Sequence, residues 1–267
     1  MNKERVGLID ADMLLYVIMM SLEHELVFGN EVLRMARLDD VRCGFWDAIA
    51  DWKTKHRLTN YFLCWTGPSG FRKELFPEYK ANRRGTLKPV GFYKMKPELL
   101  EVKESVLHDV IEADDLIGIL AGKLRALSTP YVIFSGDKDL KQVPGDHAWF
   151  KRDLETVSYA KAERLFWQQT VEGDSVDNIR GCPGIGKINA ERFAQGLDIT
   201  DPYKCWQETV SLFQKKGKVD NPEDFALQQA RLVRILRFGD YDLGTKELKL
   251  WNPPSSPKPS RESLAYT

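Results

Sequence analysis

The chain has 267 residues, which is enough for one large domain, or for a domain with a smaller module, built around a sizeable hydrophobic core. Its 39 Lys and Arg residues equal its 39 Asp and Glu residues, so the formal net charge is +0 and no overall basic field attracts nucleic acid. The four cysteines are scattered without a Cys-x-x-Cys pair, which argues against structural zinc and disulfides.

Three short apolar runs predict buried strands, over Val6–Ile9, Asn60–Trp65 and Tyr131–Ser135. Helical patterns separate them, notably over Asp39–Lys55 and Asp114–Leu127. Strands that alternate with helices predict an α/β fold with a mostly parallel central sheet flanked by helices. Ligands of such sheets bind at the carboxyl ends of the strands.

The first predicted strand is followed by an apolar run, Met13–Met20. Asp10 and Asp12 precede this run where a signal peptide carries positive charge, and the run is too short to span a bilayer. We therefore expect a cytoplasmic protein with no membrane partner.

The pattern changes near Glu172 to short helices that are interrupted by glycine and proline. We expect an α/β domain over residues 1–170 and a helical module over residues 171–250. Residues 251–267 form a Pro- and Ser-rich tail, which we expect to be disordered and which is a candidate for binding a protein partner.

Carboxylates recur where the predicted strands and helices meet loops. They are Asp10, Glu112, Asp114, Asp115, Asp137, Asp139, Asp174 and Asp177. Brought together, they would repel one another unless cations neutralised them, and oxygen ligands select magnesium or manganese over zinc. Two such ions roughly 4 Å apart would suit phosphodiester hydrolysis. Each group alone could instead cap a helix or lie in a solvated turn.

Residues 173–187 place acids next to a glycine turn. Asp174 and Asp177 are three apart, so on a helical turn they would share a face and could hold one cation. The backbone amides of the Gly184–Ile185–Gly186 turn could face a phosphate oxygen. Helix capping is the alternative explanation for both halves.

A local excess of positive charge lies in residues 71–103, which contain nine Lys or Arg and four Glu. Phe71, Tyr79, Phe92 and Tyr93 are interleaved with these charges. Cations with aromatic rings suit contact with a nucleic-acid backbone and stacking on bases. An ordinary solvated surface segment is the alternative.

Five ordered segments of the chain, LIDADMLLY, FRKELFPEYKANR, EADDLIGILA, FSGDKDLKQV and GDSVDNIRGCPGIGK, resemble the motifs of the 5′ nucleases. This family comprises flap endonucleases, the 5′-nuclease domain of bacterial DNA polymerase I and bacteriophage 5′-to-3′ exonucleases. The resemblance covers roughly residues 6–195 and is greatest to the phage enzymes. It implies a nuclease domain with a metal-bearing α/β sheet, a basic arch over residues 71–103 and a helix-hairpin-helix module that grips duplex DNA.

The resemblance also implies roles for individual residues. It makes all eight carboxylates named above metal ligands, for two Mg²⁺ or Mn²⁺ ions. The implied catalytic residues are Asp10, Asp137, Lys80 and Arg83, the last two near the scissile phosphate. The implied DNA-binding residues are Arg72, Lys73, Tyr79, Lys80, Arg83, Arg84, Gly184, Ile185, Gly186 and Lys187. The glycine turn of the family often holds a potassium ion, so K⁺ is a candidate cofactor there.

The chain departs from the family pattern at two positions. Trp65 stands where the family usually has an Asp, so one ligand is missing or supplied from elsewhere, with Asp12 a candidate. Lys187 follows Gly186 directly, one place earlier than the family's lysine, and Ile188 takes the expected position.

The leading hypothesis is a monomeric, metal-dependent 5′-to-3′ exonuclease that gives 5′-phosphate products in phage DNA replication. Its substrate would be duplex DNA with a 5′ end, nick or flap. Flap cleavage and RNase H-like removal of primer from an RNA/DNA hybrid are further expected activities. The alternatives are a structure-specific DNA-binding protein that has lost catalysis, because of Trp65, and an RNase of the related toxin class.

Overall fold

The structure is a computed structural model that describes residues 5–83, 85–216 and 219–255. The chain divides into two compact units. The first consists of the chain up to Ala162 together with Ile235–Lys249, and the second of Glu163–Arg234 and the chain from Leu250 on. Residues 235–249, which the sequence analysis places in the helical module, therefore belong to the first unit. Arg84 and tail residues 256–267 lie outside the described residues.

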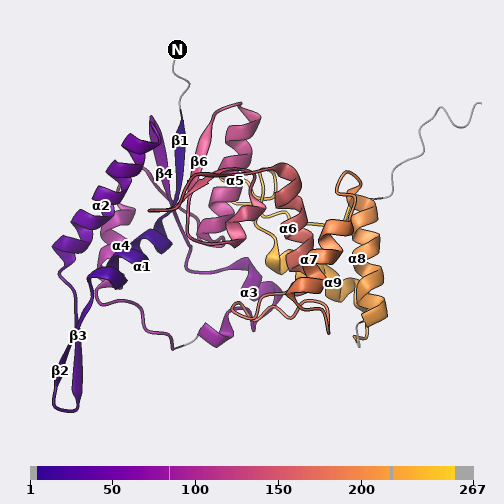
Figure 1. Ribbon diagram of the computed structural model, residues 1–267, viewed down its shortest axis with the longest axis horizontal. Helices are drawn as coiled ribbons and strands as arrows, with labels where there is room; N and C mark the ends of the chain where they lie inside the picture. The colour runs from indigo at the N-terminus through magenta and orange to yellow at the C-terminus, as the bar shows by residue number, and fades with distance from the viewer. Residues whose placement is uncertain (1–4, 84, 217–218, 256–267) are drawn as a thin grey trace, which may run out of the picture. The chain divides into compact units, whose positions relative to one another are not determined.

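A mixed sheet forms the centre of the first unit (Figure 1). In the described residues its order is β5-β4-β1-β6-β7-β8, with all neighbours parallel except β7 and β8. The strands are β1 (Val6–Asp10), β4 (Asn60–Trp65), β5 (Ser105–Leu107), β6 (Tyr131–Phe134), β7 (Gly145–Ala148) and β8 (Glu155–Val157). The predicted α/β class with a mostly parallel sheet is confirmed, and the three predicted strands are its adjacent central strands.

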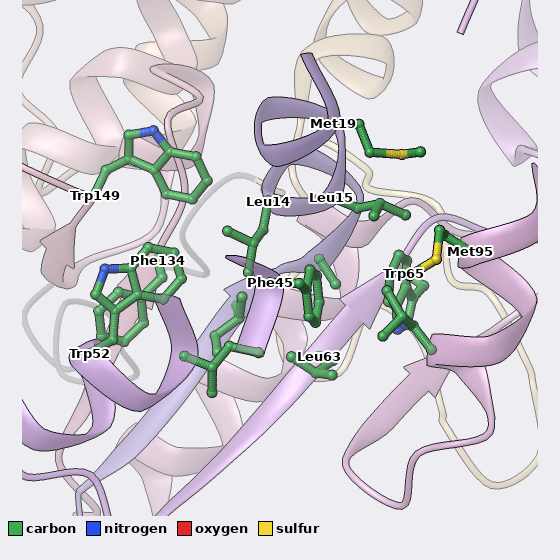
Figure 2. Packing of buried hydrophobic residues seen from close by; sticks show 14 of the residues in the cluster. Leu14, Leu15, Met19, Phe45, Trp52, Leu63, Trp65, Met95, Phe134 and Trp149 are labelled. Carbon is green, nitrogen blue, oxygen red and sulfur yellow. The ribbon is translucent and has the colours of Figure 1, made fainter. Parts of the chain in front are cut away.

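Helices cover both faces of this sheet (Figure 1). On one face lie α1 (Ala11–Leu22), α2 (Leu38–Lys55) and α4 (Phe92–Leu100), and α5 (Ala113–Ala126) packs against the other. Figure 2 shows the aromatic core under α1 and α2, where the Trp52 and Phe134 rings stack with centroids 4.7 Å apart. The apolar run near the N-terminus is thus a helix packed on the sheet. None of the helices in the described ranges is long and apolar enough to cross a membrane.

An antiparallel hairpin, β2 (His24–Phe28) and β3 (Glu31–Met35), links α1 and α2 and was not predicted. Gly29 lies at its tip with φ +60, a conformation that glycine adopts at little cost. The hairpin exposes several large apolar side chains, including Val27 and Phe28. Its Gly-Asn turn between two apolar runs is a hairpin signal.

The second unit is helical. Helix α6 (Tyr159–Glu172) runs into it from the first unit and is followed by α7 (Lys187–Gly196), α8 (Pro202–Lys216) and α9 (Pro222–Val233). Its core contains Phe166, Trp206 and Phe213, which are buried together with small residues of α7 and α9. This core is separate from the one under the sheet.

Candidate active site

Asp10 is the last residue of β1 and also caps α1. Its Oδ1 accepts the Met13 amide hydrogen at 3.0 Å and its Oδ2 accepts the Ser135 hydroxyl at 2.9 Å. The pKa of Asp10 is raised from 3.8 to about 7. Burial is the main cause, and the charges of Asp12 and Asp137 add to it, while the two hydrogen bonds act in the opposite direction. The Asp10 carboxyl group is therefore held at the strand end by hydrogen bonds from Met13 and Ser135.

Asp114, in the first turn of α5, also has a raised pKa. Burial raises the pKa of Asp114 well above its ordinary value, and the charges of Asp10, Asp137 and Glu112 raise it further, while Lys80 lowers it. The structure thus brings Asp10, Asp114 and Asp137 close enough to repel one another, as expected from the ends of β1 and β6.

Ser135 connects two of these acids. Its hydroxyl donates to Asp10 Oδ2 and accepts the Asp137 amide hydrogen at 3.0 Å. Asp137 Oδ1 in turn accepts the Asp139 amide hydrogen at 2.8 Å, at the start of the 3₁₀ turn Asp139–Gln142. Ser135 was not among the residues predicted from the sequence, although a hydroxyl residue directly after a buried strand and before an acid is the signal that points to it.

Glu112 differs from these acids because its charge is compensated by the protein. Burial alone would raise the pKa of Glu112, but the charges of Arg72 and Lys80, with hydrogen bonds from Lys80 and Tyr79, lower it to about 2. Lys80 Nζ lies 2.6 Å from Glu112 Oε1, and the Tyr79 hydroxyl lies 2.9 Å from Oε2. Lys80 is thereby anchored by Glu112, near the carboxyl group of Asp114.

Asp115 is fully buried in a two-point ion pair with Arg72. Its oxygens also accept the amide hydrogens of Glu112 and Leu236. This arrangement corrects two expectations. Both oxygens of Asp115, which was expected to be a metal ligand, accept hydrogen bonds from Arg72 and from backbone amides. Arg72, which was expected to bind DNA, is an internal cation with only 5% of its side chain exposed.

The aromatic rings of the basic segment are also less available than the sequence analysis expected. Phe71, Tyr79 and Phe92 are buried, whereas Tyr93 is 79% exposed. Stacking of bases on Tyr79 is therefore not supported. The segment folds into α3 (Phe71–Leu75), a 3₁₀ turn over Ala81–Arg83 and α4, and it exposes Lys73 and Arg83.

Trp65, in the place of the family acid, is buried at the end of β4, and its Nε1 donates to Ser105 Oγ at 3.0 Å. Asp12, the candidate replacement, already accepts hydrogen bonds on both oxygens, from Lys96 Nζ at 2.7 Å and from the Thr66 amide at 2.6 Å. Lys96 and Thr66 were missed by the sequence analysis. Lys96 lies one helical turn after the buried Phe92, and this spacing is the signal that it faces inward.

The second unit contains Asp174 and Asp177 in a tight loop, in which the Asp177 amide donates to the Asp174 carbonyl at 3.2 Å. Asp174 and Ile179 pair through two backbone hydrogen bonds of 2.9 and 2.7 Å. Gly173 and Gly181 close the loop at its base with φ +74 and +65, and a Cβ on either would lie 2.5 Å from the amide nitrogen of the other. Only glycine fits at these two positions.

The glycine turn of the second unit is open to solvent. Gly184 has φ +76, and a Cβ built on Gly184 or Gly186 would meet no atom within 4 Å. Gly186 caps α7, so Lys187 is the first residue of that helix and is exposed. Ile185 is half-buried, and its amide donates to the Cys182 carbonyl at 3.0 Å.

The donor chemistry of the first-unit acids fits a hard divalent cation. Asp10, Asp114 and Asp137 offer only carboxylate oxygens, and their mutual repulsion would be relieved by such an ion. Among the residues that the structure describes, no three His, Cys, Asp or Glu side chains converge into a ready-made metal site. Asp10, Asp114 and Asp137 are therefore neighbours, but they are not arranged as a preformed metal site.

The chain is similar in sequence to known proteins. Residues 5–172 match the family model of the 5′-3′ exonuclease N-terminal resolvase-like domain. The chain is 29% identical over 280 residues to an exodeoxyribonuclease of Enterobacteria phage T3, with 92% of each chain covered. It is 28% identical over 277 residues to an exonuclease of Escherichia phage T7, covering 91% of this chain and 92% of the relative.

Among solved structures, the chain is similar in fold to the bacteriophage T5 flap endonuclease in a pseudo-enzyme-product complex with DNA and metal ions. The TM-score is 0.62 at 17% identity, with 86% of this chain and 89% of the other covered. At this identity the likeness concerns the fold alone.

Proposed function

Because this chain belongs to the 5′-3′ exonuclease family, we propose that it hydrolyses DNA from a 5′ end in a reaction that depends on divalent metal. The observation that supports this most is the group Asp10, Asp114 and Asp137, three neighbouring carboxyl groups that lie beside the anchored cation Lys80. An ordinary folded protein avoids such a group, because like charges that lie close together repel one another.

Asp10, Asp114 and Asp137 would hold Mg²⁺ or Mn²⁺, with Asp139 as a further ligand at the same strand end. We propose that two such ions bind. They would lower the pKa of bound water and offset the charge that develops on the phosphate. Asp174 and Asp177 are proposed as additional ligands on the strength of the motif in which they stand.

Lys80 and the exposed Arg83 would act on the substrate directly. Lys80 Nζ is held by Glu112 at 2.6 Å, so its ammonium is positioned before DNA arrives and loses little side-chain entropy on binding. Arg83, at the end of its 3₁₀ turn, and Lys73 supply further positive charge on this segment. Glu112 therefore has a positioning role in this proposal.

The substrate is proposed to be duplex DNA with a 5′ end, a nick or a flap, and the products to carry 5′-phosphates. Removal of RNA from an RNA/DNA hybrid is proposed as a related activity. We propose that the protein acts as a monomer in the host cytoplasm during the replication of phage DNA. The open turn of Gly184 and Gly186 before α7 would bind the duplex backbone, where K⁺ is a candidate ligand. A replication protein that binds the tail is a further proposed partner.

Cleavage of 5′-labelled duplex and flap DNA tests the proposal. Asp114→Asn should reduce the rate by roughly 10²-fold or more in Mg²⁺ and leave DNA binding intact, because it removes a ligand charge and keeps the shape. Asp109→Asn is the matched control, since Asp109 is an exposed acid five residues earlier in the same segment. Wild-type cleavage that persists in excess chelator would overturn the metal-dependent mechanism.

A binding protein without catalysis is the second candidate, and the buried Trp65 favours it because it removes one expected acid from the end of β4. This candidate predicts structure-specific DNA binding and no product on any of these substrates. A product ladder that requires metal rejects it. Affinity that falls steeply with salt is expected from either candidate, because each neutralised phosphate releases a counterion.

A further inference from the structure

Lys96, on α4 of the first unit, is a largely buried cation. It lies on α4 between the buried Met95 and Leu99, and only 20% of its side chain is exposed. Its Nζ lies 2.7 Å from Asp12 Oδ1, 3.1 Å from the Thr66 carbonyl oxygen and 5.5 Å from the centre of the Trp65 ring. The ammonium is thus held by a carboxylate, a carbonyl and an aromatic face at once.

Lys96 compensates the negative charge of Asp12, as a bound metal ion would do. Lys96 neutralises this charge, and the Thr66 amide occupies the second oxygen of Asp12 at 2.6 Å. Asp12 is near enough to Asp10 for its charge to raise the pKa of that carboxyl group. Without Lys96, an additional uncompensated carboxylate would stand next to the proposed metal ligands.

Thr66 ties this pair to the helix that carries the other acids. Its amide donates to Asp12, its carbonyl accepts from Lys96, and its hydroxyl accepts the Ala113 amide hydrogen at 3.1 Å in the first turn of α5. These contacts are made by the residue directly after Trp65, which stands where the pattern of the 5′ nucleases has an Asp. Lys96 and Asp12 are therefore neighbours of the proposed centre through the backbone as well as through charge.

We propose that Lys96 limits how many divalent ions this centre binds: its ammonium takes the place of a metal ion on Asp12 and keeps that carboxylate out of the coordination sphere. This inference rests on the proposed function, because it assumes that Asp10 and its neighbours hold metal. Its physical basis is competition, since an ammonium and a divalent cation compensate the same carboxylate charge.

The test is the number of Mn²⁺ ions bound per chain without DNA, measured by electron paramagnetic resonance titration of the full-length protein. Lys96→Met removes the charge and keeps most of the side-chain volume against Trp65. It should bind one more Mn²⁺ than the wild type, and the double variant Lys96→Met with Asp12→Asn should return to the wild-type number. Lys94→Met, on the exposed side of the same helix, is the matched control and should equal the wild type.

The single variant Asp12→Asn provides a second test that does not depend on Lys96→Met folding. It should bind as many Mn²⁺ ions as the wild type, because Asp12 is not a ligand while Lys96 is present. Loss of an ion in Asp12→Asn, or an unchanged number in folded Lys96→Met, overturns the inference and leaves the proposed function standing. A wild-type protein that binds no Mn²⁺ overturns both.

Discussion

Arg72 and Asp115 form a two-point ion pair inside the first unit, with Nη1 2.7 Å from Oδ2 and Nη2 2.8 Å from Oδ1. The Asp115 side chain is fully buried and that of Arg72 is 5% exposed. Two parallel charge-assisted hydrogen bonds fix both planes relative to each other. The pair therefore sets the position of α5, and with it the positions of Glu112 and Asp114, relative to α3.

Arg72→Met should lower the free energy of unfolding by about 3–5 kcal/mol, because it leaves the carboxylate of Asp115 buried without its partner. Urea denaturation followed by tryptophan fluorescence measures this. Lys73→Met, at the exposed neighbouring position, should change stability by less than about 0.5 kcal/mol. Equal midpoints for the two variants would contradict an internal role for Arg72.

Metal binding should weaken as the pH falls below 7. The raised pKa of Asp10, about 7, means that the carboxyl group binds a proton below that pH, and a cation must displace this proton. The apparent Mn²⁺ affinity should fall by up to about tenfold per pH unit below 7 and level off above it. Calorimetric titration between pH 6 and 8 in buffers of different ionisation enthalpy measures both the affinity and the proton released.

The same shift has a defined sign for the metal-free protein. Because the folded pKa of Asp10 lies above its unfolded value of 3.8, the folded state holds the extra proton between these values. The stability contribution of this group is present below pH 3.8 and is lost as the pH rises through 7. Mg²⁺ should therefore raise the Tm more at pH 8 than at pH 6, and an equal increase at both pH values would argue against Asp10 as a ligand.

Asp174→Ala should abolish cleavage and spare DNA binding if the acidic loop of the second unit contributes ligands. The backbone pairing between Asp174 and Ile179 should survive, because its two hydrogen bonds do not involve the removed side chain, although the hydrogen bond from the Val176 amide to Asp174 Oδ1 is lost. Cleavage assays in Mg²⁺ with parallel binding assays in chelator separate the two effects. Ser175→Ala, at the exposed next position, is the control, and full activity of Asp174→Ala would remove this residue from the proposal.

Gly173→Ala should open the acidic loop. The added Cβ would lie 2.5 Å from the Gly181 amide nitrogen at a residue with φ +74, so we expect a loss of about 2 kcal/mol or more. Hydrogen exchange at the Ile179 amide, which donates to the Asp174 carbonyl, reports the opening directly. Gly196→Ala, where a Cβ meets nothing within 4 Å, should leave that exchange rate unchanged.

The central sheet was predictable because its main strands are continuous apolar runs. Asn60–Trp65 coincides with β4, and Val6–Ile9 and Tyr131–Ser135 each differ from their strands by one residue at the end. The strands β5, β7 and β8 have the sequences SVL, GDHA and ETV, which are short and interrupted by polar residues, so they do not form continuous apolar runs. They form because the sheet offers an edge, which is a tertiary effect.

The acids at the strand ends could be located from sequence, but their charge partners could not. Asp114 and Asp115 are neighbours in the chain, yet one lies among other carboxylates and the other faces Arg72. Successive positions on a helix point about 100° apart, so adjacent acids enter different surroundings. Which cation each one meets depends on the path of residues 71–83, and no local pattern encodes that path.

The return of residues 235–249 to the first unit has a consequence for biosynthesis. Leu236 donates its amide hydrogen to Asp115, 121 residues earlier in the chain, and its carbonyl oxygen leaves no room for a Cβ on Gly118. The ribosome therefore delivers α7, α8 and α9 before it delivers this last donor to the buried ion pair. The first unit therefore cannot complete this ion pair until the helices of the second unit have been synthesised, so the two units cannot fold strictly one after the other along the nascent chain.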